Sequence, residues 1–268
     1  MRRAWVFVMI TALSGCSPAY QKGAIPVNEE GSGKDVRWLK AEAKGLGTLD
    51  VAMVKPEGFG PFPTVIILHG NHGFAREYLE IARTLARQGV VGVTGCWFKS
   101  EGADNRFINP IACPDAPAPS VLTNQNVPVV VDAMVKAALQ QPEVKKDQIA
   151  FFGHSRGGEA ALLYLLNGGA MKALVLNSSG YPDEVIAQAS KINIPVLVLH
   201  GTADSPGDGG SPMSDIQRAR RFVDAMHAAQ KTPEVVYYNG GRHNGLFSGP
   251  KQYDDQMQRI STFLHKNL

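Results

Sequence analysis

Short runs of apolar residues alternate along most of the chain with longer segments whose apolar residues follow a helical spacing. Two runs near the start, 36–43 and 49–54, are separated by glycines and predict a hairpin. The later runs are apolar on both faces, which is typical of strands buried under helices on each side. These runs are 64–68, 90–94, 149–152, 173–176, 196–199 and 235–238.

Helical periodicity is found between these runs, in segments 76–88, 128–140, 157–166, 214–229 and 251–266. Strands that alternate with helices predict right-handed crossovers and a mostly parallel sheet with helices on both faces. We therefore expect one α/β domain over residues 36–268, with about eight strands. No long insertion separates the strand at 173–176 from the helix that follows it, so we expect no large lid over the site.

The composition of the 268-residue chain excludes several classes of protein. Hydrophobic residues make up 44% and charged residues only 19%, which is enough apolar material for a sizeable core. The formal net charge of +3 is weak and no basic run is present, so we expect no nucleic-acid partner. No cluster of Cys or His has metal-ligand spacing, and we expect no metal or organic cofactor.

The first residues predict export. Two arginines precede an apolar stretch, 4–13, that is too short to cross a bilayer as a helix, so residues 1–15 are predicted to be a signal peptide. The Leu-Ser-Gly-Cys sequence that ends at Cys16 resembles the bacterial lipobox, in which the cysteine carries the lipid. We expect Cys16 to anchor the chain on the periplasmic side of the cell envelope, as its only membrane contact, with 16–35 as a tether. Cleavage beyond Ala19, which leaves a free periplasmic protein, is the alternative.

Export would expose the other two cysteines, Cys96 and Cys113, to an oxidising compartment. They form an even pair, so we expect a disulfide between them. Two free buried thiols are the alternative. A bridge would stabilise the fold by restricting the unfolded chain.

Candidate chemistry begins directly after the strand at 149–152, in the sequence Gly-His-Ser-Arg-Gly-Gly that contains Ser155. A Gly-x-Ser-x-Gly sequence between a strand and a helix predicts a nucleophile elbow, a sharp turn that exposes the serine hydroxyl. The glycines are needed because a Cβ there would collide with the neighbouring strand and helix. Ser155 is the candidate nucleophile, and an ordinary serine in a strand-to-helix turn is the alternative.

A serine hydroxyl needs a base to accept its proton, and seven histidines are available. His243 is best placed, because it lies in a glycine-flanked loop between the strand at 235–238 and the last helix. His72 is its main competitor. His69 and His200 each end a strand in a His-Gly pair, where a packing or hydrogen-bonding role is favoured.

The imidazole in turn needs a carboxylate that fixes its tautomer and stabilises the imidazolium. Asp204, which follows the strand at 196–199 in the sequence His-Gly-Thr-Ala-Asp, is our candidate. Asp208 in the same glycine-rich loop and Asp183 after the strand at 173–176 remain as alternatives.

Four motifs in sequence order resemble those of the α/β-hydrolases: His69-Gly70, the Ser155 elbow, His200-Gly201-x-x-Asp204 and Gly241-Arg242-His243. The chain order Ser, Asp, His agrees with that superfamily. Within it, the chain resembles the dienelactone-hydrolase-like group, which shades into the platelet-activating-factor acetylhydrolases, over residues 36–268. Dienelactone hydrolases proper have a cysteine nucleophile, so Ser155 departs from them and lactone specificity does not transfer.

The loop after the strand at 64–68 also resembles the oxyanion loop of this fold. The resemblance implies main-chain N–H donors from Asn71 and from Arg156, the residue after the nucleophile. We expect the Arg156 side chain itself to make a structural salt bridge.

These residues predict a serine ester hydrolase that acts through an acyl-enzyme on a small-molecule or lipid-like ester. A prolyl-oligopeptidase-like aminopeptidase shares the fold and is the first alternative; a noncatalytic lipoprotein that keeps the fold as a binding module is the second. Candidate substrate contacts are His72, Trp97, Tyr181, Leu246 and Phe247, and plain packing is the alternative for the aromatic residues.

Overall fold

The computed structural model describes residues 33–99, 108–208 and 210–268. Eight strands form one sheet in the order β1-β2-β4-β3-β5-β6-β7-β8, which confirms the predicted architecture. The strands are β1 (Arg37–Ala43), β2 (Gly47–Val54), β3 (Phe62–Leu68), β4 (Val91–Gly95), β5 (Val144–His154), β6 (Ala173–Asn177), β7 (Val196–Gly201) and β8 (Glu234–Tyr238). The predicted signal peptide, Cys16 and nearly all of the predicted tether lie outside the described residues.

Only one strand of the described sheet runs against its neighbours. β2 pairs antiparallel with β1, as the predicted hairpin requires, and also antiparallel with β4. All other pairs are parallel. Their runs are apolar on both faces because both faces are covered by helices.

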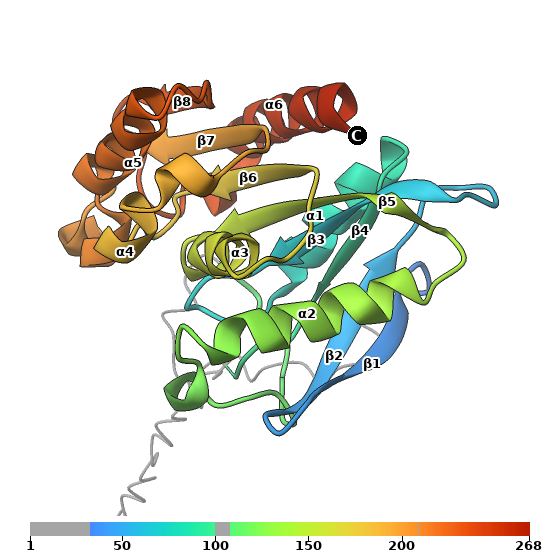
Figure 1. Cartoon of the computed structure of the whole chain (residues 1–268). Coiled ribbons are helices and arrows are strands. Elements are labelled where there is room, and N and C mark those ends of the chain that lie inside the picture. Colours follow the sequence, from blue (N-terminus) through green and yellow to red (C-terminus); the bar gives the residue numbers. More distant parts are fainter. Residues whose placement is uncertain (1–32, 100–107, 209) are drawn as a thin grey trace, which may run out of the picture.

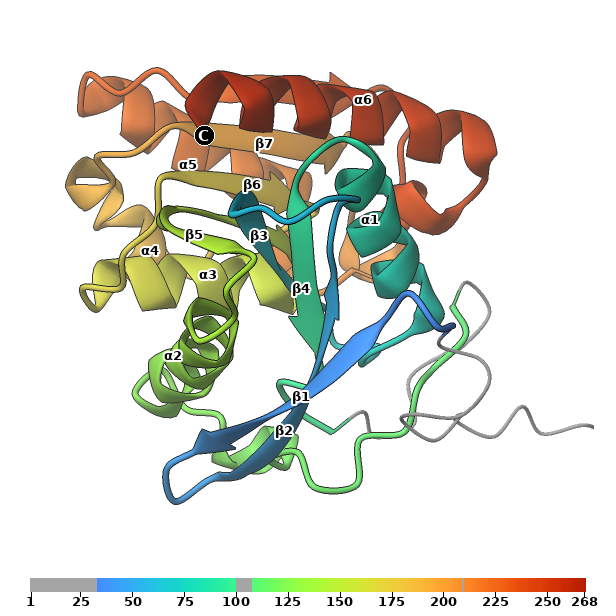
Figure 2. The ribbon, with the colours of Figure 1, turned by 90° about the vertical axis from the view of Figure 1, so that its right-hand side faces the viewer.

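Helices cover the two faces of the sheet in separate layers, as Figures 1 and 2 show. One buried cluster joins α2, α3 and α5 to one face, and a second joins α1 and α6 to the other. The helices are α1 (Arg76–Arg87), α2 (Asn126–Leu139), α3 (Arg156–Leu166), α4 (Asp183–Ile186), α5 (Ile216–Ala228) and α6 (Pro250–Asn267).

Two local features differ from the sequence pattern or add to it. β5 begins at Val144, before the apolar run at 149–152, because Val144 already pairs with Phe62 of β3. Lys146 and Asp147, at the irregularity in this pairing, are exposed. The connection from β6 to β7 contains the four-residue helix α4 and a 3-10 turn, Ala189–Lys191. This short connection agrees with the expectation that no large lid is inserted there.

The strand order reverses direction at β3, and this reversal positions the candidate site. β3 lies between β4 and β5, so the chain leaves it on one side and later returns on the other. In open α/β sheets, ligands bind outside the carboxyl ends of the strands at such a point. The loop after β3 and the turn after β5 therefore meet at one edge of the sheet.

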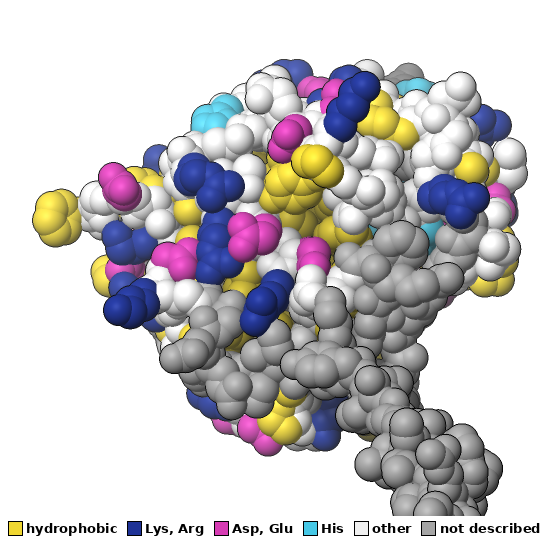
Figure 3. All heavy atoms as spheres, turned by 180° about the vertical axis from the view of Figure 1, so that it is seen from behind, with side chains coloured by type: hydrophobic (Ala, Val, Ile, Leu, Met, Phe, Trp, Pro, Cys, Tyr) yellow, Lys and Arg dark blue, Asp and Glu magenta, His cyan; other side chains and the backbone are white. Residues whose placement is uncertain are grey.

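The described surface carries charges of both signs. On the face drawn in Figure 3, Lys and Arg side chains lie next to Asp and Glu side chains rather than in a field of one sign. Within the described residues, no helix is both long and apolar enough to span a membrane.

Candidate active site

Ser155 occupies a strained turn between β5 and α3. Its φ of 54° lies in a region that non-glycine residues rarely adopt, so the surrounding structure must hold it there. A Cβ on Gly153 would collide with the backbone of Gly158, and one on Gly157 would collide with the carbonyl of Leu68. The glycines of the elbow are therefore required by close backbone approach, as predicted.

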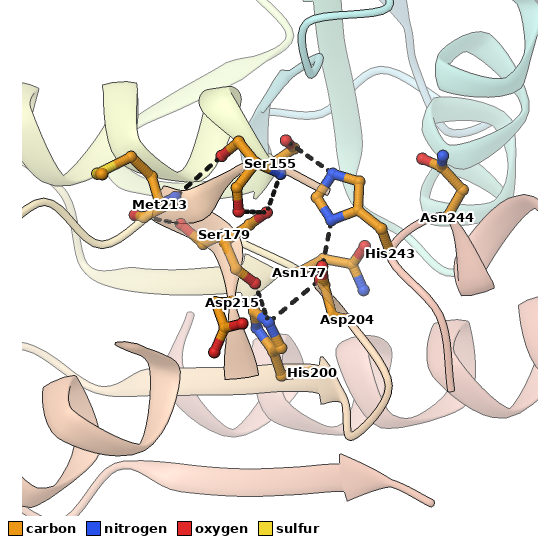
Figure 4. A network of polar contacts seen from close by, with 12 residues as sticks. Ser155, Asn177, Ser179, His200, Asp204, Met213, Asp215, His243 and Asn244 are labelled. Atoms are coloured by element: carbon orange, nitrogen blue, oxygen red, sulfur yellow. Dashed lines mark hydrogen bonds and ion pairs between the residues drawn. The ribbon is translucent and has the colours of Figure 1, made fainter. Parts of the chain in front are cut away.

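The candidate base and acid lie in line with this serine (Figure 4). His243 Nε2 is 3.0 Å from the Ser155 hydroxyl oxygen, and His243 Nδ1 is 2.8 Å from Asp204 Oδ2. Because an ionised carboxylate only accepts hydrogen bonds, Nδ1 carries the proton and Nε2 is left to accept from the serine. All three side chains are almost entirely buried.

Two of the alternatives weighed for the base and the acid are bound to other partners. His72 is hydrogen-bonded to the hydroxyl of Tyr78 at 2.6 Å. Asp183 is exposed and forms ion pairs with Arg218 and Arg221. The geometry thus brings together Ser155, His243 and Asp204, the three residues expected from the sequence.

The carboxyl group of Asp204 is held in its charged form. Burial by itself raises the pKa of this carboxyl, but the imidazoles of His200 and His243 outweigh burial, and the pKa lies below its ordinary value. A carboxylate that stays charged can stabilise the imidazolium that forms during proton transfer.

The loop after β3 is fixed next to Ser155 by two aromatic side chains. Trp97 donates its indole N–H to the His69 carbonyl at 3.1 Å, and Tyr78 accepts the Gly70 N–H at 3.0 Å. A Cβ on Gly70 would lie 3.0 Å from the Ser155 Cβ, so the loop and Ser155 are adjacent.

The two main-chain N–H groups predicted to bind an oxyanion lie close to Ser155. Asn71 follows Gly70 in this fixed loop, and no hydrogen bond from its main-chain N–H to another described residue is found. Arg156 is the first residue of α3, so its N–H has no acceptor one turn earlier within the helix. Both amides are thus free for an incoming oxygen, at the positive end of the helix.

The Arg156 side chain makes no salt bridge with a described residue, which differs from the expectation. Its guanidinium lies over the Phe98 ring, 4.9 Å from the ring centroid, and donates to Asn71 Oδ1 at 3.3 Å. Burial lowers the pKa of the group. The Phe98 ring stabilises the cation in place of an anion.

The predicted substrate contacts separate into two groups. Trp97 and Tyr181 are fully buried, with Tyr181 stacked on Phe222, and neither presents a surface to a substrate. Phe247 is partly exposed, and its ring contacts those of His72 and His154.

Leu246 and Phe247 also line a hollow of about 320 Å³ between α1 and the start of α6. Thr84 and Tyr253 form part of its wall and are hydrogen-bonded to each other at 2.9 Å. Of the five residues proposed to contact substrate, His72 and Phe247 keep partly exposed side chains next to the site.

Several polar residues that support the site were not identified from the sequence. His154 contacts Asn177 Oδ1 at 2.7 Å, and Asn177 donates to Gln256 on α6 at 2.6 Å. Burial lowers the pKa of His154 to about 3, so its ring is neutral behind His243. Tyr78 was missed as well, because a tyrosine in an amphipathic helix carries no sign of which loop its hydroxyl reaches.

Cys96 and Cys113 form a disulfide, as predicted. The bridge ties the end of β4 to the chain that returns after residue 107. Within the described ranges, no group of three or more His, Cys, Asp and Glu is arranged to hold a metal ion.

Comparison with known proteins agrees with this fold and shows the family. The profile of the dienelactone hydrolase family matches residues 49–261. This chain belongs to that family. The match spans the sheet from β2 onward and includes the elbow, Asp204 and His243.

Among relatives in this hydrolase family, a protein of Methylorubrum extorquens assigned as a carboxymethylenebutenolidase is 26% identical over 205 residues, which cover 74% of this chain and 68% of the relative. A protein of a Bradyrhizobium species, assigned as a 2-oxo-3-(5-oxofuran-2-ylidene)propanoate lactonase, is 26% identical over 77% of this chain and 82% of its own.

Solved structures share the fold. A dienelactone-hydrolase-like promiscuous phosphotriesterase from metagenomic libraries superimposes with a TM-score of 0.68 at 18% identity, over 87% of this chain and 98% of its own. The acylaminoacyl peptidase of Pyrococcus horikoshii gives a TM-score of 0.68 at 17% identity, but only 41% of that chain is covered.

Proposed function

We propose that this family member is a serine hydrolase that cleaves carboxylic esters through an acyl-enzyme. The observation that carries the proposal is the position of His243, with one ring nitrogen 3.0 Å from the Ser155 hydroxyl and the other 2.8 Å from Asp204. The relatives assigned as carboxymethylenebutenolidase and lactonase act on cyclic esters, which supports ester hydrolysis as the reaction class.

In the proposed reaction, Ser155 Oγ attacks the ester carbonyl carbon while its proton passes to His243 Nε2. The main-chain amides of Asn71 and Arg156 receive the charge that develops on the carbonyl oxygen. His243 then gives the proton to the leaving alkoxide, and the carbon–oxygen bond breaks. Water attacks the acyl-enzyme in the same way and returns the hydroxyl to Ser155.

Asp204 stays ionised through this cycle. Its carboxylate holds the His243 ring with Nδ1 protonated and stabilises the imidazolium without taking the proton. The lowered pKa of Asp204 supports this role, because proton transfer from His243 to so weak a base is unfavourable.

The proposal is tested with a fluorophosphonate probe and a panel of p-nitrophenyl esters and peptide p-nitroanilides. We expect the probe to label Ser155 alone, mapped by mass spectrometry, and the esters to be hydrolysed faster than the peptides. Heat-unfolded protein is the control and should not be labelled. Faster cleavage of the peptides would favour the aminopeptidase alternative, and absence of labelling would favour a noncatalytic binding module.

We further propose that the enzyme works at the periplasmic side of the cell envelope, attached through a lipid on Cys16. The Cys96–Cys113 disulfide supports an oxidising compartment. In a bacterial host, Cys16→Ser is expected to release the protein from the membrane fraction and abolish palmitate labelling. Unchanged membrane association of this variant would contradict the anchor.

A further inference from the structure

A second imidazole contacts the candidate acid from the side opposite His243. His200 lies near the end of β7, and its Nε2 is 3.2 Å from Asp204 Oδ2, the same oxygen that His243 approaches. His200 Nε2 is also 2.8 Å from the main-chain oxygen of Ser214. Figure 4 shows Asp204 between the two rings.

The tautomer of His200 follows from these partners. A main-chain oxygen only accepts hydrogen bonds, so His200 Nε2 must carry a hydrogen. That N–H donates to the Ser214 main-chain oxygen, and Asp204 Oδ2 lies 3.2 Å from the same nitrogen as an ion-pair contact. His200 Nδ1 is buried and has no partner among the described residues, so nothing competes for the ring from its other side.

Asp204 depends on these two contacts. The residue is fully buried, and its second oxygen, Oδ1, has no hydrogen-bond partner within the described chain. A buried carboxylate is strongly unfavourable unless it is paired. Since Oδ1 is unpaired, the hydrogen bond with His243 and the contact with His200, both at Oδ2, are the interactions that hold the charge.

His200 is also anchored more firmly than the acid that it contacts. It belongs to the buried strand β7 and its ring lies beside that of Tyr181, whereas Asp204 lies in the loop between β7 and α5. Loop residues move more than strand residues, and a functional side chain on a loop needs a support on the rigid scaffold. Ser214, the other partner of His200, closes the last turn of that loop with a capping box to Ser211.

We propose that His200 is a positioning residue of the catalytic site: its Nε2–H ties Asp204 Oδ2 to the sheet and to the Ser214 carbonyl, so that the carboxylate keeps its direction toward His243. The inference rests on the proposed function only where it concerns the effect of His200 on turnover. The contact between His200 and Asp204 itself is measurable in protein that turns over no substrate.

Other groups around Asp204 have to be considered in the test. His243 faces it from the loop before α6, His154 from the end of β5, and Tyr181 from the segment after β6. All three are unchanged in the variants below, so a difference between those variants reports on His200.

The test compares His200→Met with His200→Gln. The two replacements have similar size and flexibility, but only glutamine places an N–H donor near the position of Nε2. The titration of the Asp204 carboxyl is followed by carbon-13 NMR as the pH is lowered. The carboxyl signal that is missing in Asp204→Asn is assigned to Asp204. In His200→Met we expect Asp204 to titrate about one pH unit higher than in wild type, and in His200→Gln close to wild type.

Turnover provides the second readout. In His200→Met we expect kcat for an activated ester to fall about tenfold with KM within twofold, and in His200→Gln to fall less than threefold. Equal titration of Asp204 in wild type and His200→Met, or equal losses of kcat in the two variants, would overturn the proposal. If wild type is inactive toward esters but the titration of Asp204 shifts as expected, the proposed ester hydrolase function is contradicted and the role of His200 in holding Asp204 is supported.

If His200→Met does not fold, the same contact is read from the other side. In wild type and in Asp204→Asn, the His200 Nε2–H proton is observed by nitrogen-edited NMR. We expect it to move upfield when the carboxylate becomes an amide, because the charged acceptor is lost. An unchanged shift would show that the N–H bonds to Ser214 alone and would overturn the proposal.

Discussion

Trp97 donates its indole N–H to the main-chain oxygen of His69, 3.1 Å away. The bond connects the chain after β4 to the loop that presents the Asn71 amide. Because Trp97 directly follows Cys96, the disulfide and the indole connect the chain after β4 to the loop after β3, which lies next to Ser155.

Loss of this hydrogen bond is expected to weaken catalysis more than folding. Trp97→Phe keeps an aromatic ring but removes the N–H, which leaves the buried His69 carbonyl without its donor. We expect kcat/KM for an activated ester to fall about fivefold, equivalent to about 1 kcal/mol. Trp38→Phe is the comparison variant, because it makes the same replacement at a tryptophan whose ring packs edge-on against Phe74. Equal losses in the two variants would contradict a specific role for Trp97.

The disulfide is expected to stabilise the whole domain. It closes a loop with a sequence separation of 17, for which the chain-entropy model gives about 3 kcal/mol. In urea unfolding, Cys96→Ser/Cys113→Ser should therefore have a free energy of unfolding lower by about 3 kcal/mol than oxidised wild type. Reduced wild type should match the double variant. A double variant as stable as oxidised wild type would show that the bridge adds nothing to the fold.

Two buried histidines are expected to make the fold sensitive to acid. Burial lowers the pKa of both His69 and His154 to about 3, from an ordinary value of 6.5. Between these values the unfolded chain binds protons that the folded protein does not, so stability falls as the pH is lowered below about 6.5. Each histidine contributes a loss on the order of 1 kcal/mol per pH unit.

Urea unfolding at a series of pH values from 7.5 to 4.5 measures this slope. His69→Leu removes one of these groups and is expected to reduce the slope, while His154 and His72, whose pKa burial also lowers, remain. A free energy of unfolding that stays constant across this range would contradict neutral, buried imidazoles.

The fold and the three central side chains were accessible from the sequence, since each depends on a local pattern. Continuous apolar runs mark strands covered on both faces, and the glycines around Ser155 mark a turn where no Cβ fits. Asp204 and His243 each follow a strand directly, so the parallel sheet brings them to the same edge. For these residues, the position in the sequence is enough to predict the position at the edge of the sheet.

The supporting residues were not accessible in the same way. Tyr78 and Trp97 each support the site through one polar atom that bonds to a residue distant in the sequence. The sequence around a tyrosine or tryptophan does not show whether its polar atom makes such a bond or whether the ring only packs. The Arg156 side chain was expected to form a salt bridge, but among the described residues it contacts the Phe98 ring and the Asn71 amide. Such contacts depend on tertiary distances that no local pattern encodes.

The central claim is that Ser155 is the nucleophile of an ester hydrolase. The most direct measurement is the rate of p-nitrophenyl acetate hydrolysis by wild type and by Ser155→Ala, with melting temperatures recorded to show that both are folded. The account predicts measurable turnover by wild type and a loss of at least about a thousandfold in the variant. Turnover retained by a folded Ser155→Ala protein would contradict it.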